Sequence, residues 1–416
     1  MKKITLSTLA ALALTATVSA NDITIIKKDS QDFALGKETK INMKFNAQDV
    51  KEMWLKMGVR IQGTFEGKKT TDSTGVSTTN QDAYLRRTRL EVQAGFSKTA
   101  SFVMDIRNDK VNYEDKGEQT FNVGDAYIKI KKPFGSDAVN FKLYRAKIDI
   151  SRTETVKSAR VIAYDRPYVA DEAAQYITHN RRGTNAQAYG KLFDGKIKYQ
   201  VAVGDATYSG KMKDSEGNSF DKGIVDSQTF FYGGKVKLSP FTGWEEKTVT
   251  ETYMGKGKHF TVGASYWKVD DIQLDNNTSG TNGLTRSLMN AELSAHYKGA
   301  FIQAEYFEFD GVVENATDFV TSVNTTTGKS NGWYVTGEYV FTDLNYIAPF
   351  FRYESWDKLS GKDGYNLRSR LAGINWYLRG NTTKMGLIVQ RDDYGVNLKN
   401  GGDKVESVRI TTQWFF

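Results

Sequence analysis

The feature of this sequence that most restricts its fold is a repeated alternation of apolar and polar residues over long segments. In the segment Met289–Tyr297, every second residue from Met289 onwards is apolar, and the residues between are asparagine, glutamate, serine and histidine. The segment Tyr84–Phe96 alternates in the same way, with Arg87, Arg89 and Glu91 on its polar face. Successive side chains of a strand point to opposite sides, so this period of two predicts strands with one apolar and one polar face.

Such strands fit two kinds of β protein. A soluble sandwich turns its apolar faces inward, whereas a membrane barrel turns them outward into lipid and keeps its polar faces in a wet interior. Strand length favours the barrel, because a tilted membrane strand needs about 9–11 residues and soluble strands cluster near five or six. Sixteen long strands are predicted, an even number as single-chain bacterial barrels require: residues 54–66, 83–96, 101–109, 121–132, 138–148, 183–194, 195–206, 227–240, 258–270, 286–298, 299–310, 331–342, 346–357, 366–379, 382–392 and 405–416.

The connections between these strands alternate between long and short. The long ones are residues 67–82, 110–120, 149–182, 207–226, 271–285, 311–330, 358–365 and 393–404, and the short ones include 97–100, 133–137, 194–195, 298–299, 343–345 and 380–381. Bacterial barrels have short periplasmic turns and long outer loops, so this rhythm places both termini in the periplasm. Residues 241–257 are an exception, because a long connection stands where a short turn is due.

The chain begins with a segment typical of secretion. Lys2 and Lys3 precede an apolar stretch that ends in Val18-Ser19-Ala20, which predicts a signal peptide over residues 1–20. Without its two lysines, the 57 basic and 49 acidic residues leave a net charge of +6. Residues 21–53 are predicted to form a hairpin-like or extended periplasmic segment, which either plugs the barrel from below or supports subunit contacts.

Composition narrows the remaining possibilities. The part of the chain over residues 54–416 contains no linker rich in proline or serine, so one barrel domain is predicted. No run of eighteen apolar residues follows the leader, which excludes a membrane-spanning helix. The absence of cysteine excludes thiolate metal sites and covalent c-type haem, and three histidines leave little for a metal centre. We therefore predict no cofactor, no metal and no nucleic-acid partner.

The end of the chain also suits a membrane barrel. The last strand alternates through Val408, Ile410 and Trp414, and the final residue is Phe416. This pattern resembles the C-terminal signature by which the outer-membrane assembly machinery recognises its substrates. With the leader, it predicts the outer membrane of a Gram-negative bacterium, surrounded by lipid and lipopolysaccharide. Aromatic residues at strand ends suit the interfacial girdles of such barrels: Trp54, Tyr84, Phe102, Phe134, Phe141, Phe193, Tyr266, Tyr297, Trp333, Phe341, Tyr353 and Trp376.

Four short motifs resemble the phosphate-selective porin O and P family. They are the Arg-Arg-x-Arg run within residues 82–90, Arg181-Arg182-Gly183, Gly332-Trp333-Tyr334 and the segment Gly373–Leu378. The similarity spans roughly residues 54–416. It implies a sixteen-stranded barrel, a homotrimer and a third outer loop folded into the pore. It implies no particular solute, because the family includes members with other substrates.

The segment 149–182 is the longest without clear strand alternation, and long loops in compact folds are usually functional. If it folds inward, it narrows the lumen and places its charges where the field is most focused. If it lies outside, its charges pair with one another at the surface. Basic residues on this loop and on the inward strand faces predict attraction of anions. The candidate pore-lining and anion-binding residues are Arg87, Arg89, Arg107, Lys129, Lys142, Arg152, Arg160, Arg166, Arg181 and Arg182.

Other charged residues modify this prediction. Further basic lumen candidates are Lys131, Lys157, Lys191, Lys198, Lys235 and Lys237, and acidic ones on the strands are Glu91, Asp105, Asp125, Glu292, Glu305, Glu338 and Glu354. The loop acids Asp149, Glu154, Asp165, Asp171 and Glu172 would neutralise the loop arginines if they pair with them. Changes from arginine to glutamate at Arg87 and Arg160 are expected to weaken an anion preference.

Together these observations predict a diffusion porin that passes small hydrophilic solutes and prefers anions such as phosphate-like oxyanions. Two other classes stay open. A structural or adhesive barrel would not conduct, and a barrel hydrolase would need serine, histidine and an orienting acid or amide within hydrogen-bond reach. Ser294 and His296 share a face, but residues two apart on a strand lie about 7 Å apart, which favours ordinary lumen lining. Single-channel recording in a planar bilayer distinguishes the three classes.

Overall fold

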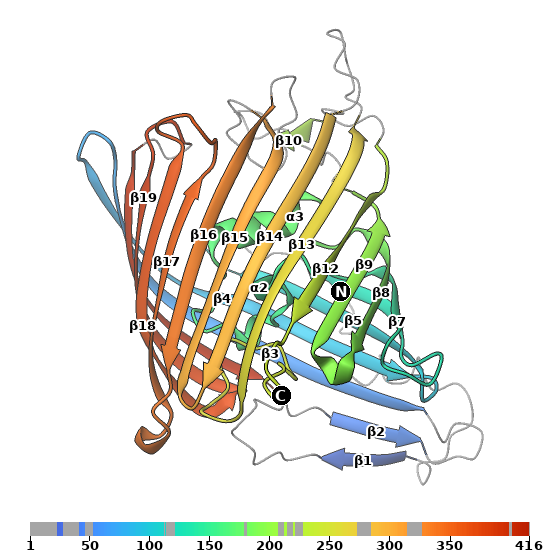
Figure 1. Ribbon diagram of the computed structural model, residues 1–416. Coiled ribbons are helices and arrows are strands. Elements are labelled where there is room, and N and C mark those ends of the chain that lie inside the picture. The colour runs from blue at the N-terminus through green and yellow to red at the C-terminus, as the bar shows by residue number, and fades with distance from the viewer. Residues whose placement is uncertain are drawn as a thin grey trace.

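Sixteen long strands close into one antiparallel ring in the computed structural model (Figure 1), because only β1 and β2 of the eighteen strands in the sheet lie outside it. The structure describes residues 23–27, 41–45, 53–111, 113, 121–178, 181–206, 212–213, 219–220, 228–272, 284–313, 327–398 and 402–415. The ring strands are β3 (Trp54–Thr71), β4 (Ser77–Gly95), β5 (Ala100–Val111), β6 (Asn122–Ile130), β7 (Asn140–Arg145), β8 (Thr184–Leu192), β9 (Ile197–Gly204), β12 (Phe231–Leu238), β13 (Lys258–Ile272), β14 (Leu284–Tyr297), β15 (Ala300–Val313), β16 (Thr327–Tyr339), β17 (Ile347–Asp357), β18 (Asn366–Asn381), β19 (Thr383–Tyr394) and β20 (Lys404–Phe415). All sixteen predicted strands are confirmed.

The ring closes where β20 pairs with β3, from Lys404 opposite Thr71 to Phe415 opposite Arg60. Below this seam, β1 (Ile23–Lys27) and β2 (Ile41–Phe45) form a hairpin, and β2 continues the sheet beside the first residues of β3. The hairpin lies below the ring in Figure 1. The predicted signal peptide over residues 1–20 and the terminal Phe416 lie outside the described residues.

The two faces of the strands have opposite character, and β20 shows this clearly. Its residues Val408, Ile410 and Trp414 are 51%, 48% and 49% exposed, whereas Thr411 and Gln413 are 2% and 0% exposed. Strands of a soluble sandwich would bury their apolar residues instead. The apolar faces therefore point outward and the polar faces point into the ring, as predicted for a membrane barrel.

One irregularity changes which side chains of β4 face inward. Gln62 of β3 pairs with Arg87, but the next residue, Gly63, pairs with Leu85, so Arg86 has no partner on β3. This is a β-bulge, in which one extra residue is accommodated in one strand. As a result Arg86 and Arg87, although consecutive, both contact groups inside the ring.

Two predictions about the first hairpin are wrong, the first of them because of the bulge. Tyr84 was expected in an outer aromatic girdle, but it is 8% exposed and its hydroxyl donates to Glu66 at 3.5 Å. Alternation counted from Arg87 without the bulge places Tyr84 on the wrong face. The long loop predicted over residues 67–82 is also wrong, because β3 and β4 remain paired up to Thr71 and Ser77.

Short helical segments lie in the connections. Between β7 and β8 are α2 (Arg152–Thr155), a 3-10 turn at Ser158–Arg160 and α3 (Tyr168–Tyr176), and Figure 1 shows α2 and α3 inside the ring. Two further 3-10 turns, Phe193–Gly195 and Thr342–Leu344, lie in short connections, and β10 (Met212–Lys213) pairs with β11 (Ser219–Phe220) between β9 and β12. Within the described residues, no helix has the length and apolar character needed to cross a membrane.

Part of the interior is apolar rather than wet, which the sequence analysis did not predict. Val169 and Tyr176 of α3 are buried in one cluster with Phe309, Trp356 and other apolar side chains of β12–β18. The Tyr176 and Phe309 rings meet edge to face with their centroids 5.1 Å apart. The apolar face of an amphipathic helix must pack against other apolar side chains. On this side of the ring, α3 packs against the barrel wall and fills the lumen.

Candidate functional site

The connection between β7 and β8 crosses the interior of the ring, and we call it loop 3, residues 146–178 and 181–183. Five of its carbonyl oxygens accept hydrogen bonds from side chains on five different strands. The pairs are Gln413 to Ala159 (3.0 Å), Lys384 to Val161 (2.6 Å), Asn375 to Ile162 (3.1 Å), Arg87 to Tyr164 (2.7 Å) and Arg352 to Asp165 (2.8 Å). Buried carbonyls need such partners, so these bonds explain how an irregular segment can lie inside the barrel.

The barrel wall also caps α3. The first turn of a helix has backbone N–H groups without helical partners, and these favour a negative charge. Glu354 of β17 accepts hydrogen bonds from the amides of Tyr168 and Val169 at 2.9 and 2.6 Å. Gly332 of β16 leaves room for the helix, because a Cβ at this position would lie 2.9 Å from a methyl carbon of Val169.

Asp165 is the most heavily bonded carboxylate of loop 3. Its oxygens accept hydrogen bonds from Arg86 Nε at 2.8 Å and Arg409 Nη1 at 2.8 Å, and Arg87 Nη2 lies 3.6 Å away. Burial alone would raise the pKa of Asp165, but the charges of Arg86 and Arg409 outweigh burial and lower this pKa. Asp165 therefore joins loop 3 to β4 and to β20.

A second carboxylate holds loop 3 together internally. Glu154 pairs with Lys147, with Arg166 at 3.2 Å and with Arg181 at 2.9 Å, and Arg181 also reaches Asp171 at 2.5 Å. Burial opposes ionisation of Glu154, but Arg166, Lys147 and Arg181 together lower its pKa. The loop acids thus neutralise part of the basic charge on the loop, as the sequence analysis anticipated.

These pKa shifts predict that loop 3 stays docked in acid. A carboxyl group whose pKa is lowered by folding contributes stability above its ordinary pKa, and this contribution is lost as the pH falls through the lowered pKa. For Asp165 and Glu154 that loss occurs below about pH 4, the ordinary value for these groups. Single-channel conductance is therefore expected to show no upward step between pH 5 and pH 4. A step near pH 4 would mean that these carboxylates titrate normally.

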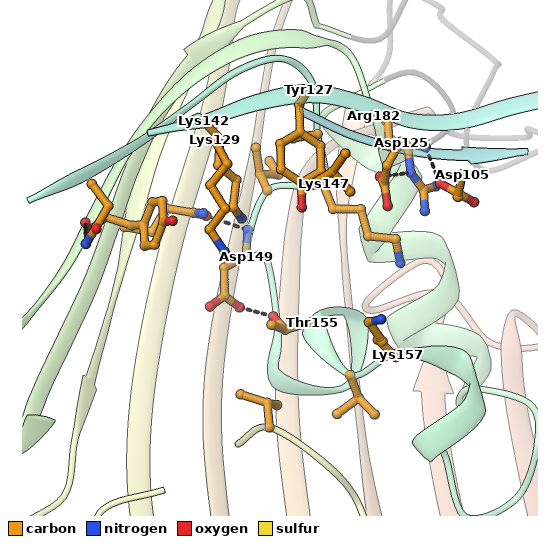
Figure 2. Close-up of a pocket in the computed structure, with 18 of the residues that line it drawn as sticks. Asp105, Asp125, Tyr127, Lys129, Lys142, Lys147, Asp149, Thr155, Lys157 and Arg182 are labelled. Atoms are coloured by element: carbon orange, nitrogen blue, oxygen red, sulfur yellow. Dashed lines mark hydrogen bonds and ion pairs between the residues drawn. The ribbon is translucent and has the colours of Figure 1, made fainter. Parts of the chain in front are cut away.

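Between loop 3 and the wall formed by β3–β9 and β12 lies a cavity of about 720 Å³. Fourteen basic and five acidic residues line it, so its charge is strongly positive. Figure 2 shows Lys129 and Lys142 on the strands above Asp149 and Thr155 of loop 3. A narrow passage lined by one sign of charge concentrates ions of the opposite sign.

The lysines of this wall are neighbours across strands. Lys129 lies directly opposite Lys142, Lys191 opposite Lys198, and Lys198 opposite Lys237. Like charges in such positions destabilise a sheet. Lys237 pairs with Asp149 of loop 3 at 3.2 Å, but the other four lysines form no ion pair within the described part of the chain. Their charges face the cavity without a protein counter-ion.

Tyrosine rings lie beside two of these lysines. The Lys142 ammonium is 5.1 Å from the Tyr189 ring centroid and 5.8 Å from that of Tyr127, and Lys129 is 5.9 Å from Tyr189. Cation–π contacts of this kind stabilise an ammonium without neutralising it. The arrangement leaves the charge of these lysines available to a solute.

The ten predicted site residues have different surroundings. Five line the cavity: Arg89, Lys129, Lys142, Arg166 and Arg182. The other five are not among its lining residues: Arg87, Arg107, Arg152, Arg160 and Arg181. Most of the arginines have acidic partners: Asp109 for Arg89, Asp105 for Arg107, Glu246 for Arg152, Glu154 for Arg166 and Arg181, and Asp125 for Arg182. Anion binding by any of the ten stays a prediction.

Sequence reasoning missed several residues of this site. Arg60 and Lys147 line the cavity, and Arg86 and Arg409 hold Asp165. Arg60 and Arg409 lie on the polar faces of their strands, so alternation could have found them. Arg86 left no such signal, because a period of two counted from Arg87 places Arg86 on the outward face and only the β-bulge turns it inward.

The serine and histidine considered for catalysis do not form a pair. Ser294 Oγ lies 3.2 Å from His259 Nε2 and 2.7 Å from Thr261 Oγ1, whereas His296 Nε2 lies 3.1 Å from the Lys256 carbonyl. Ser294 is 0% exposed. A nucleophile must be reachable by its substrate, so this arrangement gives no support to a hydrolase. Among the described residues no cluster of three potential metal ligands is found.

The short motifs noted in the sequence lie where the wall meets loop 3. Arg86 and Arg87 bond to it directly, and Asn375 donates to the Ile162 carbonyl. The Tyr334 hydroxyl donates at 2.6 Å to Glu305, which in turn accepts from a loop 3 amide. The motifs therefore help to hold the loop in place.

A sixteen-stranded antiparallel ring, outward apolar faces and a loop folded across the interior together define a β-barrel of the porin class. Within that class, the chain belongs to the phosphate-selective porin O and P family, whose sequence profile matches residues 55–416. The resemblance seen in the motifs is thereby confirmed.

Comparisons with individual proteins agree with this class. The chain is 22% identical to an uncharacterized protein of Aquifex aeolicus (strain VF5) over 422 residues, 95% of this chain and 97% of that relative. The anion-selective porin from Comamonas acidovorans superposes with a TM-score of 0.56 at 11% identity, over 88% of this chain and 100% of that one. OmpF of Salmonella typhi, solved in complex with daunomycin, gives 0.54 at 16% identity, over 87% and 98%. At these identities the two structures show a shared fold.

Proposed function

We propose that this protein is an outer-membrane diffusion porin that passes small hydrophilic solutes and prefers anions. The observation that carries the proposal is the cavity beside loop 3, with fourteen basic residues against five acidic ones. Unpaired lysines on neighbouring strands add to it, because an anion passing between them relieves their mutual repulsion. The family and the anion-selective porin from Comamonas acidovorans support the same function.

Loop 3 has a defined role in this proposal. It constricts the pore, since it bonds to the wall at β4 and β17–β20 and leaves the cavity on its other side. Charges at a narrow and partly desolvated passage act more strongly on an ion than charges in a wide mouth. Of the residues predicted from the sequence, Lys129 and Lys142 are the ones we expect to act on anions directly. Arg87 is expected to act through its bond to loop 3.

The proposal also includes the membrane in which the protein lies and its oligomeric state. The family and fold favour the outer membrane of a Gram-negative bacterium, where lipid and lipopolysaccharide surround the outward faces and Phe416 serves recognition by the assembly machinery. We also propose a homotrimer, as the family resemblance implies, with the residue 21–53 segment in the periplasm. Chemical cross-linking of the detergent-solubilised protein, followed by denaturing electrophoresis, distinguishes a trimer from a monomer.

The reversal potential across a salt gradient tests the proposed function. The purified protein in a planar bilayer with a tenfold potassium chloride gradient is expected to give a potential of the sign set by chloride. A potential of the opposite sign would overturn the anion preference. A folded barrel without conductance would overturn the porin function altogether and favour a structural or adhesive barrel.

A further inference from the structure

Part of the long connection between β12 and β13, where a short turn was due, lies inside the barrel. We call it the inner turn, residues 239–257. Although it is a connection between strands, its residues Glu246, Thr250, Glu251 and Thr252 are between 1% and 4% exposed. Successive connections around the ring alternate between the two ends of the barrel. The inner turn therefore joins strands at one end, and loop 3 joins strands at the other. The inner turn and loop 3 therefore enter the lumen from opposite ends.

The two segments meet through buried polar contacts. Arg152 Nη2 of loop 3 lies 2.6 Å from Glu246 Oε1 and 2.5 Å from the Thr250 carbonyl. The Arg152 and Glu246 side chains are each only 1% exposed. Removing either partner of such a buried ion pair is strongly destabilising, because the remaining charge would be buried without water or an opposite charge.

Glu251 adds a second connection. Its carboxylate accepts hydrogen bonds from Thr153 Oγ1 at 2.8 Å and from the Ile162 amide at 2.8 Å, and its own amide donates to the Arg160 carbonyl at 3.2 Å. Thr153 and Ile162 lie on either side of the 3-10 turn of loop 3. One side chain of the inner turn thus fixes two separate points of loop 3.

The inner turn is also fixed to the barrel wall. The Tyr253 ring lies 4.6 Å from the rings of both His259 and His296, and Met254 is buried in a cluster with Val340, Ala348 of β17 and Tyr377 of β18. These contacts fill the lumen between loop 3 and the strands β13–β18. The cavity lies on the opposite side of loop 3, along β3–β9 and β12.

We propose that loop 3 and the inner turn form one partition that closes half of the lumen, with Glu246 and Glu251 as its positioning residues. Solutes then pass only through the lysine-lined half, so Glu246 and Glu251 influence selectivity although neither lines the cavity. This inference rests on the proposed function. The closed half has a different charge, because β15–β17 each turn one glutamate inward: Glu305, Glu338 and Glu354. Arg286, Arg352 and Lys384 lie on the same side. Opening it would add a path without the cationic excess of the cavity.

The test is the double variant Glu246→Ala/Glu251→Ala in a planar bilayer. We expect single-channel conductance to rise about twofold and the anion-to-cation permeability ratio to fall severalfold, because a second and less cationic path opens. Glu245→Ala is the matched control, since Glu245 lies on the same turn and pairs only loosely, at 3.8 Å, with the exposed Lys247. The control is expected to conduct like the parent.

A labelling experiment gives a second readout that does not depend on conductance. The protein has no cysteine, so Thr336→Cys places a single thiol on the closed side, where Thr336 of β16 is 4% exposed. A water-soluble methanethiosulfonate carrying a sulfonate should label this thiol at least tenfold faster in the double variant than in the parent. Glu251→Gln, which keeps the size of the side chain, serves if the double variant does not fold.

Two outcomes separate this inference from the proposed function. Conductance, permeability ratio and labelling rate could all stay at the parent values in Glu246→Ala/Glu251→Ala and in Glu251→Gln. The inner turn would then have no effect on the passage of solutes, and the partition would be overturned. If the parent itself is not anion-selective, the proposed function fails, yet faster labelling at Thr336→Cys would still support the partition.

Discussion

The Asp165→Asn variant is expected to conduct about twice as well as the parent, because loop 3 loses the ion pairs that join it to β4 and β20, and the passage widens. Asp165 binds Arg86 and Arg409, and Arg87 lies within 3.6 Å of it. An asparagine of the same size leaves three guanidinium groups close together without their shared anion. Removing one partner of a fully buried ion pair costs about 3–5 kcal/mol, and the cost is smaller here because the Asp165 side chain is 25% exposed.

Conductance is the measurement of choice because it reports on loop position in the folded channel. Far-UV circular dichroism of the same sample confirms that the barrel is intact. Asp343→Asn is a matched control, because Asp343 lies in the exposed turn Thr342–Leu344 and is not among the residues that line the cavity. Unchanged conductance and unchanged open-channel noise in Asp165→Asn would show that the remaining hydrogen bonds hold loop 3 without the carboxylate.

The second large effect is expected from the double variant Lys129→Glu/Lys142→Glu, which should lower the anion-to-cation permeability ratio at least tenfold. At about 8 Å in water, each unit charge changes the energy of a passing ion by about 0.5 kcal/mol. The two substitutions change the wall by four charge units, and screening by salt removes part of the effect. A tenfold change requires only about 1.4 kcal/mol in the difference between anion and cation.

Lys247→Glu is the control for this experiment, because Lys247 is a lysine of the inner turn whose side chain is 85% exposed. The same charge reversal there should leave the ratio close to that of the parent. If Lys129→Glu/Lys142→Glu leaves the reversal potential unchanged while the control behaves as expected, the selectivity lies elsewhere. The paired arginines of the cavity would then be the next candidates.

Local sequence pattern was sufficient to predict the barrel. The alternation in Met289–Tyr297 predicted both the strand and its faces, since Met289 and Tyr297 are 41% and 53% exposed while Ser294 is buried. This works because strand periodicity and outward apolar faces are properties of each segment by itself. The same reasoning failed at Tyr84, where a single bulge shifted the alternation.

The site was harder to predict because its contacts join distant parts of the chain. The partners of Asp165 are 79 and 244 residues away along the sequence. No periodicity reveals that Arg409 and Asp165 meet, and Asp165 could equally have paired with a loop arginine, as Glu154 does. The unexpected length of residues 241–257 is a sequence signal for the inner turn. That this segment folds into the lumen is visible only from the burial of Glu246 and Glu251 in the structure.

The position of Asp165 has a consequence for the order in which the barrel assembles. Its partners Arg86 and Arg409 lie on β4 and β20, the two strands that flank β3. These strands come together only when β20, the last of the chain, pairs with β3, the first of the ring. The three-residue cluster therefore does not exist in a partly assembled sheet. Completion of the ring and locking of loop 3 are the same event, so a barrel that has not closed is also one whose pore is not yet selective.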